Sequence, residues 1–520
     1  MTSPTATLAQ PRLRAGLALS VLALAWALAL GSVPLALTVL LALLVGLRPR
    51  ELRLLYALAA PLWGHRVFLR TLLRVSRVGD AMLPVVSFRL WPLARHPVLL
   101  VNDPALVREV VQQGALFHTM GGENPAIVAL LGPQGLFTTQ ATDSPEWRRR
   151  RRVTDPLLSG DPLYTARIFT DLLAASRTYA ADWHGHQPGL LVAIARVMLP
   201  AQSLALFAEP FTPERHRQAG ADLLANFRGI GEGLFFALTD RLRRPWTRHH
   251  LARSWDYIAD ITAVITADAR AASPDEARPG MFRLLSTALR DGTYDDAEVR
   301  DTVALFLNAG APIHLVFWTL HTLAHHRDVE TDLVAEIRRA TATGPLTFAR
   351  LAELPRLRAV LLEVMRLYPP VPLFQPRRAA RDTTLGDTPV AAGTQLLLCP
   401  YVFQRNPALT ADVESFRPDR TGNALTAAHM LPFSVGARTC QGRQFAMLAA
   451  TAALVAILER HTLHLDERVP CPHPSEAVYC RPSHDIAFSA SPRPHTDAPA
   501  DAATHTAPAS RCPFHALFAR

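Results

Sequence analysis

The hydrophobic pattern of the chain is dominated at its start by one long uncharged stretch. Residues 15–47 contain no charged side chain, and about 20 apolar residues are enough for a helix to cross a bilayer. Gly31, Ser32 and Pro34 lie inside the stretch, so it can form one pass or a re-entrant pair. A cleaved signal peptide is the alternative, but the apolar run continues well past the small residues that would suit cleavage. We therefore predict a retained membrane anchor over residues 1–50.

The charges around this anchor predict its orientation. Two arginines precede the apolar run and four follow it, namely Arg12 and Arg14, then Arg48, Arg50, Arg53 and Arg66. Because the cytoplasmic flanks of membrane spans carry the excess of positive charge, we expect the rest of the chain in the cytoplasm. Residues 51–78 are basic and amphipathic, which is typical of a segment that lies at the membrane face.

Beyond the anchor, the pattern alternates between strand-like and helix-like periods. Residues 85–91 and 97–103 predict two short strands joined by a turn, and residues 394–400 predict another. Helical patterns with Pro and Gly breaks dominate between residues 103 and 340. From residue 489 the sequence is biased to Pro, Ala, Thr and Ser and has no apolar period. We predict one mainly α domain with small β-sheets over residues 51–488, and a disordered tail over residues 489–520.

Composition changes this picture only slightly. The 520 residues carry a net charge of +10, and all 54 basic residues are arginine. This charge suits an acidic partner or an anionic membrane surface, and we expect no nucleic-acid partner. The five cysteines are Cys399, Cys440, Cys471, Cys480 and Cys512. They form no Cys-x-x-Cys pair, so a zinc site is not expected, and their sparse, odd number predicts a reducing compartment rather than a disulfide scaffold.

The most specific chemistry of the sequence lies in the loop "LPFSVGARTCQG", before an apolar helical pattern. Cys440 stands between Gly436 and Gly442, and a thiol near a helix N-terminus is expected to have a lowered pKa. Glycines allow a flat ligand to approach the backbone. Phe433 can pack beneath such a ligand, and Arg438 can bind a carboxylate on it. A flat ligand that has carboxylates and a metal that takes a thiolate is haem. The alternative is a free cysteine in a loop.

These five residues reproduce a known signature. Phe433, Gly436, Arg438, Cys440 and Gly442 match F-x-x-G-x-R-x-C-x-G, so the chain resembles the cytochromes P-450 from about residue 85 to residue 488. The resemblance implies the fold of that family, a single large helical domain with small sheets. It also implies haem b (iron protoporphyrin IX) as the cofactor and Cys440 as the axial ligand of the haem iron.

Further landmarks of the family appear in the expected order. Glu363 and Arg366 match the E-x-x-R helix motif, and Arg420 matches the arginine of a later segment, in which Asp419 replaces the usual Glu. The resemblance implies that Glu363, Arg366 and Arg420 form a buried structural triad. A pair three residues apart on a helix can meet, and such a pair needs further partners when it is buried.

The resemblance also implies a set of residues that hold the haem propionates. This set is Trp147, Arg151, Arg377 and Arg438. The arginine run at residues 148–152 would wrap around a helix, so not all of it can face haem. Its remaining members predict either a solvated face or a docking surface for an acidic electron donor.

The central helix departs from the family. The family usually carries A-G-x-(Asp/Glu)-Thr there, and the acid and the threonine relay protons to iron-bound dioxygen. Depending on the register, this chain places either Pro312 and Ile313 or Gly310 and Ala311 at those positions. Neither choice restores an acid or a hydroxyl.

Two further features of this helix follow from its sequence. The stretch from Asp295 to Glu298 resembles a helix cap, and Pro312 should kink the helix by removing a hydrogen bond. His314 is a candidate proton relay, with an ordinary core or solvated histidine as the alternative.

The resemblance implies a monooxygenase that inserts one oxygen atom from O2 into an organic substrate by hydroxylation or epoxidation. The anchor and the apolar segment "YPPVPLF" favour a lipophilic substrate. Electrons would come from a separate donor, either ferredoxin with its reductase or a flavin reductase. The missing acid–threonine pair leaves a second hypothesis, an isomerase, dehydratase or peroxygenase, and a third is a non-catalytic haem-binding protein.

Overall fold

A computed structural model gives the fold. It describes residues 64–78, 81–88, 96–123, 125–139, 144–158, 162–207, 237–272, 280–408, 412–422, 430–475 and 479–493. The predicted anchor, the start of the predicted domain and most of the predicted tail lie outside these residues.

Helices make up most of the described chain, as the sequence predicts. The α-helices are α4 (Gly64–Val75), α5 (Pro104–Gln112), α6 (Pro125–Leu131), α7 (Pro145–Leu158), α8 (Pro162–Ala180), α9 (Leu190–Phe207), α11 (Ala237–Arg270), α12 (Gly280–Arg290), α13 (Asp296–Leu307), α14 (Ala311–Ala324), α15 (Arg327–Ala342), α16 (Pro355–Leu367), α17 (Pro400–Phe403) and α18 (Arg443–Leu458). Short 3-10 helices are η1 (Gly121–Glu123), η2 (Phe348–Glu353) and η3 (Pro418–Gly422).

The strands are short and form small sheets. They are β1 (Arg77–Val78), β2 (Ala81–Met82), β3 (Val85–Phe88), β4 (Val98–Val101), β5 (Phe117–Thr119), β6 (Gly185–Gln187), β7 (Arg377–Ala379), β8 (Thr383–Leu385), β9 (Thr388–Val390), β10 (Gln395–Leu398), β11 (His461–Leu465), β12 (Pro474–Ser475), β13 (Arg481–Pro482) and β14 (Phe488–Pro492). The largest sheet has the order β3-β4-β10-β7-β5. In it β10 runs parallel to β4, and the other pairs are antiparallel.

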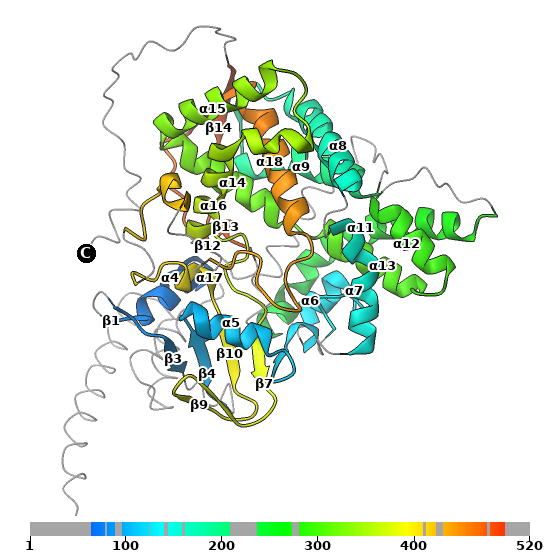
Figure 1. Cartoon of the computed structure of the whole chain (residues 1–520), viewed down its shortest axis with the longest axis vertical. Coiled ribbons are helices and arrows are strands. Elements are labelled where there is room, and N and C mark those ends of the chain that lie inside the picture. The colour runs from blue at the N-terminus through cyan, green and yellow to red at the C-terminus, as the bar shows by residue number, and fades with distance from the viewer. Residues whose placement is uncertain are drawn as a thin grey trace, which may run out of the picture.

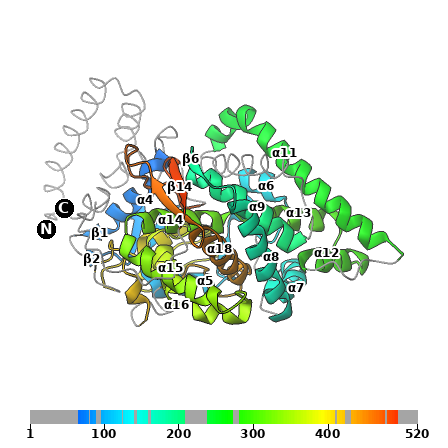
Figure 2. The same ribbon diagram turned by 90° about the horizontal axis from the view of Figure 1, so that it is seen from above.

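The five-stranded sheet and the main helices occupy different parts of the molecule. Figure 1 shows β3, β4, β10 and β7 at one end, and α8, α9, α14 and α18 grouped toward the other. The contacts agree, because α18 packs against α8 and α14, and α9 packs against α8 and α14. Seen from above, the long α11 runs along one side of the molecule beside α12 and α13 (Figure 2). The helical group therefore forms the main core.

Burial explains why the core helices carry so few charges. In α18 every residue from Leu448 to Leu458 except Thr451 is buried, and α14 is buried from Pro312 to Leu323. A helix that is apolar all round is stable only when protein covers all of its faces. Among the described helices, α9 and the stretch Asp296–Ala324 are long and apolar enough to cross a membrane, but both are mostly buried inside the protein.

Several local predictions can be compared directly with the structure. The two strands predicted near residues 85 and 97 form the antiparallel pair β3 and β4. Asp295 caps α13, and its carboxylate accepts from Glu298 N at 2.7 Å in a complete capping box. The predicted start of the tail at residue 489 falls inside β14, which runs to Pro492 and pairs with β11. The pairing covers the alternate buried residues Phe488 and Ala490, a short pattern that the Pro- and Ala-rich composition hides.

Candidate functional site

The loop before α18 presents Cys440 through a tight backbone arrangement. Cys440 N donates to the carbonyl oxygen of Phe433 at 2.9 Å, which closes the loop on itself. Gly436 has a φ of +72°, and a Cβ there would lie 3.3 Å from the carbonyl oxygen of Val111. Any other residue would be strained at this position and crowded against α5. The loop therefore has a fixed shape that depends on the glycine.

The thiol of Cys440 is exposed but sits among protein groups. Removal of water by the surrounding protein raises its pKa, and this effect outweighs the lowering by the Gly442 N–H, Arg151 and Arg443. The expected lowered pKa is therefore wrong for the structure as it stands. The physical reason is removal of water from the thiol, and Cys440 also lies two residues before Gly442, the N-cap of α18. A bound cation is what would favour the thiolate here.

Two arginines flank the same indole ring beside this loop. The guanidinium carbon of Arg438 lies 4.7 Å from the ring centroid of Trp147, and that of Arg151 lies 5.3 Å from it. Arg438 also donates to the carbonyl oxygens of Leu136 at 3.0 Å and Thr139 at 2.6 Å. Trp147 is buried and donates from Nε1 to Leu136 O at 3.2 Å. Stacking and hydrogen bonds thus hold both cations close to Cys440.

Arg377, at the start of β7, completes a group of three cations. Burial lowers the pKa of Arg377 to about 10, and its buried Nε and Nη1 have no hydrogen-bond partner within the described residues. Burial also lowers the pKa of Arg438 to about 9, with further lowering by Arg377 and Arg151. Buried cations that lie close together, such as Arg377 and Arg438, are costly unless an anion joins them. The site therefore fits a ligand that carries carboxylates next to a thiolate-binding metal, as haem does.

Two other arginines of the run, Arg149 and Arg150, form ion pairs with one carboxylate of the protein. Arg150 Nε lies 2.6 Å from Glu298 Oε1, and Arg149 Nη1 lies 3.1 Å from Glu298 Oε2. Glu298 is nearly fully buried in the first turn of α13. These two arginines therefore join α7 to α13, whereas Arg148 and Arg152 are exposed on the surface of α7.

The structure brings the predicted triad together. Arg366 donates from Nε and Nη2 to the two carboxylate oxygens of Glu363, each at 2.9 Å, and both side chains are fully buried. Arg420 Nε reaches Glu363 Oε1 at 3.0 Å. Arg366 Nη1 also donates to Val413 O at 2.6 Å. The triad therefore joins α16 to the segment that contains η3.

The central helix is interrupted rather than kinked. Helix α13 ends at Leu307, α14 begins at Ala311, and Gly310 N donates to Asn308 O at 2.9 Å between them. Pro312 lies in the first turn of α14, where its missing N–H costs no intrahelical hydrogen bond. The predicted kink at Pro312 is thus replaced by a break two to four residues earlier. No acid or hydroxyl occupies residues 308–313.

His314 lies one turn into α14, against the break. It is fully buried, and its Nδ1 is 3.0 Å from the carbonyl oxygen of Gly310. Its ring stacks on that of Tyr479, with centroids 5.2 Å apart and planes 7° from parallel. Tyr479 donates from its hydroxyl to Asn308 O at 2.9 Å. Burial lowers the pKa of His314 to about 4, so the imidazole is neutral near pH 7.

Sequence reasoning missed some residues of this region. Tyr479 had no motif to mark it, and the carbonyls of Leu136 and Thr139 belong to an unremarkable loop. A cluster of His321, His325 and Cys471 was also missed. His321 and His325 are four residues apart, but Cys471 is distant in the sequence and no motif connects it to them.

Comparisons with known proteins agree with this geometry. A family model described as "Cytochrome P450" matches residues 81–487. "25-Hydroxyvitamin D-1 alpha hydroxylase, mitochondrial" from Homo sapiens is 38% identical over 398 residues, covering 69% of this chain and 76% of the relative. "Cyclooctatin synthase" from Streptomyces melanosporofaciens is 28% identical over 423 residues, covering 77% of this chain and 87% of the relative.

A solved structure shares the fold. It is titled "Crystal structure of cytochrome P450DA heme domain" and is 20% identical in sequence, with a TM-score of 0.69. The similarity covers 82% of this chain and 94% of that one.

Proposed function

The chain belongs to the cytochrome P450 family, and on that premise we propose that it inserts one oxygen atom from O2 into a lipophilic small molecule by hydroxylation or epoxidation. As a member it is an oxidoreductase of the monooxygenase class with haem b as its cofactor. One observation carries the assignment of the site. An accessible thiol, Cys440, stands beside a group of three arginines, and the buried Nε and Nη1 of one of them, Arg377, have no hydrogen-bond partner among the described residues.

We propose that the thiolate of Cys440 would bind the haem iron. When bound, haem supplies the iron at which dioxygen is reduced, and a thiolate ligand favours cleavage of the O–O bond. The protein's part is to hold the sulfur in place. It does so through the closed loop between Phe433 and Cys440, the positive φ of Gly436 and the N–H of Gly442, which favours a negative sulfur.

Arg377, Arg438 and Arg151 would hold the two carboxylates of haem. Arg377 would exchange a desolvated, partly unsatisfied state for charge-assisted hydrogen bonds. Trp147 would keep Arg438 and Arg151 oriented, because both guanidinium groups lie over its indole ring. The Glu363–Arg366–Arg420 triad would act at a distance, as a support for the segment that precedes the Cys440 loop.

His314 is the proposed proton relay. A neutral imidazole whose Nδ1 donates to Gly310 O presents Nε2 as an acceptor. Such a group can pass a proton only by accepting it at one nitrogen and releasing one from the other. Of the titratable side chains, His314 is the closest in sequence to the break. It would therefore have to serve in place of the acid and threonine of the family pattern.

The surroundings of the site support a lipophilic substrate. The segment after α16 buries Leu373 and Phe374, and α14 is apolar along most of its length. Two relatives are named for small organic substrates, "Cyclooctat-9-en-7-ol 5-monooxygenase" and "25-hydroxyvitamin D-1 alpha hydroxylase". We also propose a separate electron donor, either ferredoxin with its reductase or a flavin reductase, and attachment to a membrane through residues 1–50.

Product formed per NADPH consumed tests this proposal. The full chain is assayed with a reductase system, and again with hydrogen peroxide alone, against a panel of lipophilic compounds. We expect product only with the reductase. His314→Ala should consume NADPH and release peroxide while product falls, because proton delivery is lost.

Two outcomes would contradict the proposal. Equal coupling in wild type and His314→Ala would remove His314 as the relay. Product at the full rate with peroxide alone would favour the peroxygenase hypothesis, and product from an organic peroxide without any reductant would favour the isomerase or dehydratase hypothesis.

A further inference from the structure

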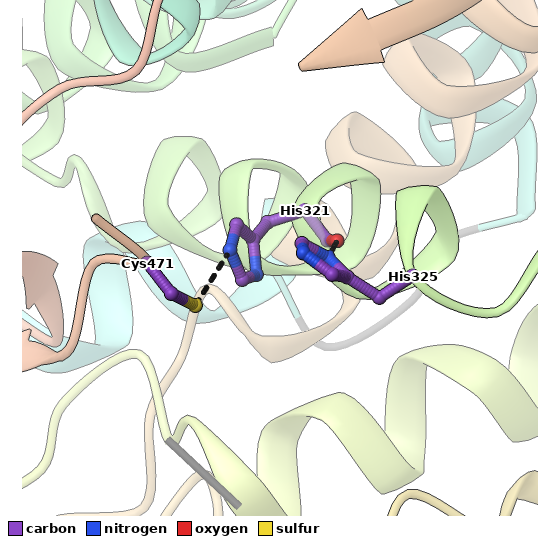
Figure 3. A group of neighbouring side chains, drawn as sticks. All are labelled: His321, His325 and Cys471. Carbon is purple, nitrogen blue, oxygen red and sulfur yellow. Dashed lines mark hydrogen bonds between the residues drawn. The ribbon is translucent and has the colours of Figure 1, made fainter. Parts of the chain in front are cut away.

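A second group of metal-binding side chains lies away from Cys440. His321 lies in the last turn of α14 and His325, four residues later, is the C-cap of this helix, so both point to the same side of it. Cys471, in the segment between β11 and β12, comes from a neighbouring part of the chain and contacts His321 (Figure 3). One ligand atom from each of the three residues lies within 4.8 Å of the others. We call these residues the His–Cys cluster.

The spacing of the His–Cys cluster suits a tetrahedral cation. His321 Nε2 lies 3.5 Å from Cys471 Sγ. A tetrahedral zinc ion with Zn–S of about 2.3 Å and Zn–N of about 2.05 Å would separate these two atoms by about 3.6 Å. The pair can therefore bind one ion with little movement. Two imidazoles and a thiolate are also ligands that zinc prefers.

The orientation of His325 points the same way. Its Nδ1 lies 2.8 Å from the carbonyl oxygen of His321, to which it donates (Figure 3). This hydrogen bond fixes the tautomer in which Nε2 carries the lone pair. Histidines that bind metals usually donate their other ring N–H to a carbonyl or carboxylate in this way, which orients the ring and raises its basicity. The ring centroids of His321 and His325 are 4.7 Å apart. Rotation of the His325 ring can therefore bring the Nε2 atoms of both histidines to one ion.

The oxidation state of Cys471 decides whether the ion can bind. Among the described cysteines, Cys399, Cys440 and Cys480 are free thiols, whereas Cys471 is disulfide-bonded. A disulfide sulfur is a poor ligand, and reduction with two electrons and two protons converts the bond into two thiols. A phosphine reductant supplies the electrons and becomes a phosphine oxide with an oxygen from water. The Cys471 thiol then loses its proton to bind the cation.

We propose that His321, His325 and Cys471 bind one thiophilic divalent cation, of which zinc is the reference, when the disulfide of Cys471 is reduced. The cation would tie the segment between β11 and β12 to α14. His314 lies seven residues earlier on this helix, which corresponds to about 10 Å along its axis. The site would thus anchor the C-terminal end of α14, opposite the end at which the break lies.

The test measures zinc bound per haem iron. The haem-loaded full chain is treated with a phosphine reductant, incubated with Zn²⁺ and desalted, and both metals are then quantified. We expect about one zinc per iron in the reduced protein and little in the untreated protein. His321→Ala, His325→Ala and Cys471→Ser should each lower zinc retention at least tenfold under reducing conditions.

His326→Ala is the matched control, because His326 is the neighbour of His325 but its ring packs at a tilt against Phe416, with centroids 5.0 Å apart. It should retain zinc like wild type. The carbon monoxide spectrum of the haem reports whether each variant is folded. Equal zinc retention in reduced and untreated protein, or in Cys471→Ser and wild type, would overturn the proposal.

X-ray absorption at the zinc edge provides a measurement that needs no variant. We expect one sulfur and the remaining ligands nitrogen or oxygen. A ligand shell without sulfur, or with two or more sulfurs, would place the ion elsewhere in the protein and overturn the proposal.

Discussion

At the scale of single residues, Cys440 is distinguished from the other described cysteines by access. Cys399 and Cys480 are buried free thiols, and burial raises the pKa of both. Neither can reach a planar ligand without unpacking the core. Access and the shape of its loop therefore single out Cys440 as the iron ligand that we propose.

Replacing Cys440 tests this directly. Cys440→Ala should abolish the thiolate-type spectrum of the carbon monoxide complex, because no other described cysteine lies in a comparable loop. Cys399→Ala and Cys480→Ala are the matched controls and should keep that spectrum. A thiolate-type spectrum in Cys440→Ala would show that another residue binds the iron.

His314 gives a second prediction, which concerns pH. Its folded pKa of about 4 lies below the ordinary 6.5, so the unfolded chain binds the proton more readily. Its contribution to the free energy of unfolding is therefore fully present above pH 6.5 and is lost as pH falls toward 4. The total loss is about 3 kcal/mol. His314→Phe keeps a ring against Tyr479 and removes the titration.

Urea unfolding at a series of pH values measures this effect. Between pH 6.5 and 4, the unfolding free energy of wild type should fall more steeply than that of His314→Phe. Below pH 4 the two curves should run parallel. Parallel curves over the whole range would mean that His314 does not change its protonation on unfolding.

Residues within one short motif were predictable, and residues that meet through the fold were not. The Cys440 loop and the Glu363–Arg366 pair are local, so spacing alone indicated that their members act together. Tyr479 meets Asn308 across 171 positions, and His321 meets Cys471 across 150. No periodicity in the sequence connects such positions. Cys471 in particular lacks the Cys-x-x-Cys spacing on which the expectation of no zinc site depended.

At the scale of elements, the break between α13 and α14 shows how the placement of a proline decides its effect. A proline in the middle of a helix removes a hydrogen bond, whereas in the first turn it removes none. The sequence indicated that Pro312 would disturb the helix but could not show that a new helix starts just before it. The break leaves the carbonyls of Asn308 and Gly310 to accept from Tyr479 and His314.

Glu298 gives a prediction for the packing of α7 on α13. Burial opposes its ionisation, but hydrogen bonds from Arg149 and Arg150 outweigh burial and lower its pKa. Glu298→Gln should lower the unfolding free energy at pH 7 by about 2 kcal/mol, as expected for hydrogen bonds to a charged group. Thermal unfolding measures the loss.

The stabilisation by Glu298 falls in acid, as that by His314 does, but the cause differs. Hydrogen bonds from arginines lower the pKa of Glu298, whereas burial lowers the pKa of His314. A carboxylate with a lowered folded pKa stabilises above its ordinary pKa, and the stabilisation disappears as pH falls through the folded value. Glu298→Gln and wild type should therefore converge in acid. Glu146→Gln, an exposed change in the first turn of α7, is the control. It should match the unfolding free energy of wild type at pH 7 and in acid. A constant difference between Glu298→Gln and wild type at all pH values would contradict the assignment.

At the scale of the whole molecule, the described residues that we propose for the haem site all come after the predicted anchor. The loop of Cys440 and the arginines on α7 and β7 all belong to the described part of the chain. The resemblance to the family predicted this fold, but the pairing of β4 with β10 could not be predicted. A strand pattern shows that a strand exists and does not show which distant strand it joins.

Removal of the apolar N-terminal segment tests the division of the chain that we propose. The chain without residues 1–47 should leave the membrane fraction and keep its haem spectrum. The comparison is the full chain, fractionated in the same way. A shortened protein that cannot take up haem would show that the segment is part of the domain.

The parallel pairing of β4 with β10 has a consequence for how the protein is made. Residues 98–101 are all buried and pair with residues 395–398, about 300 positions later. A ribosome adds about 5–20 residues per second, so the nascent chain must wait roughly 15–60 seconds for the second strand. During that time β3 can cover one edge of β4, but the other edge remains open to pairing with other chains. Slower translation or a shortage of chaperones during this interval should therefore increase aggregation, even though the finished sheet leaves β4 fully enclosed.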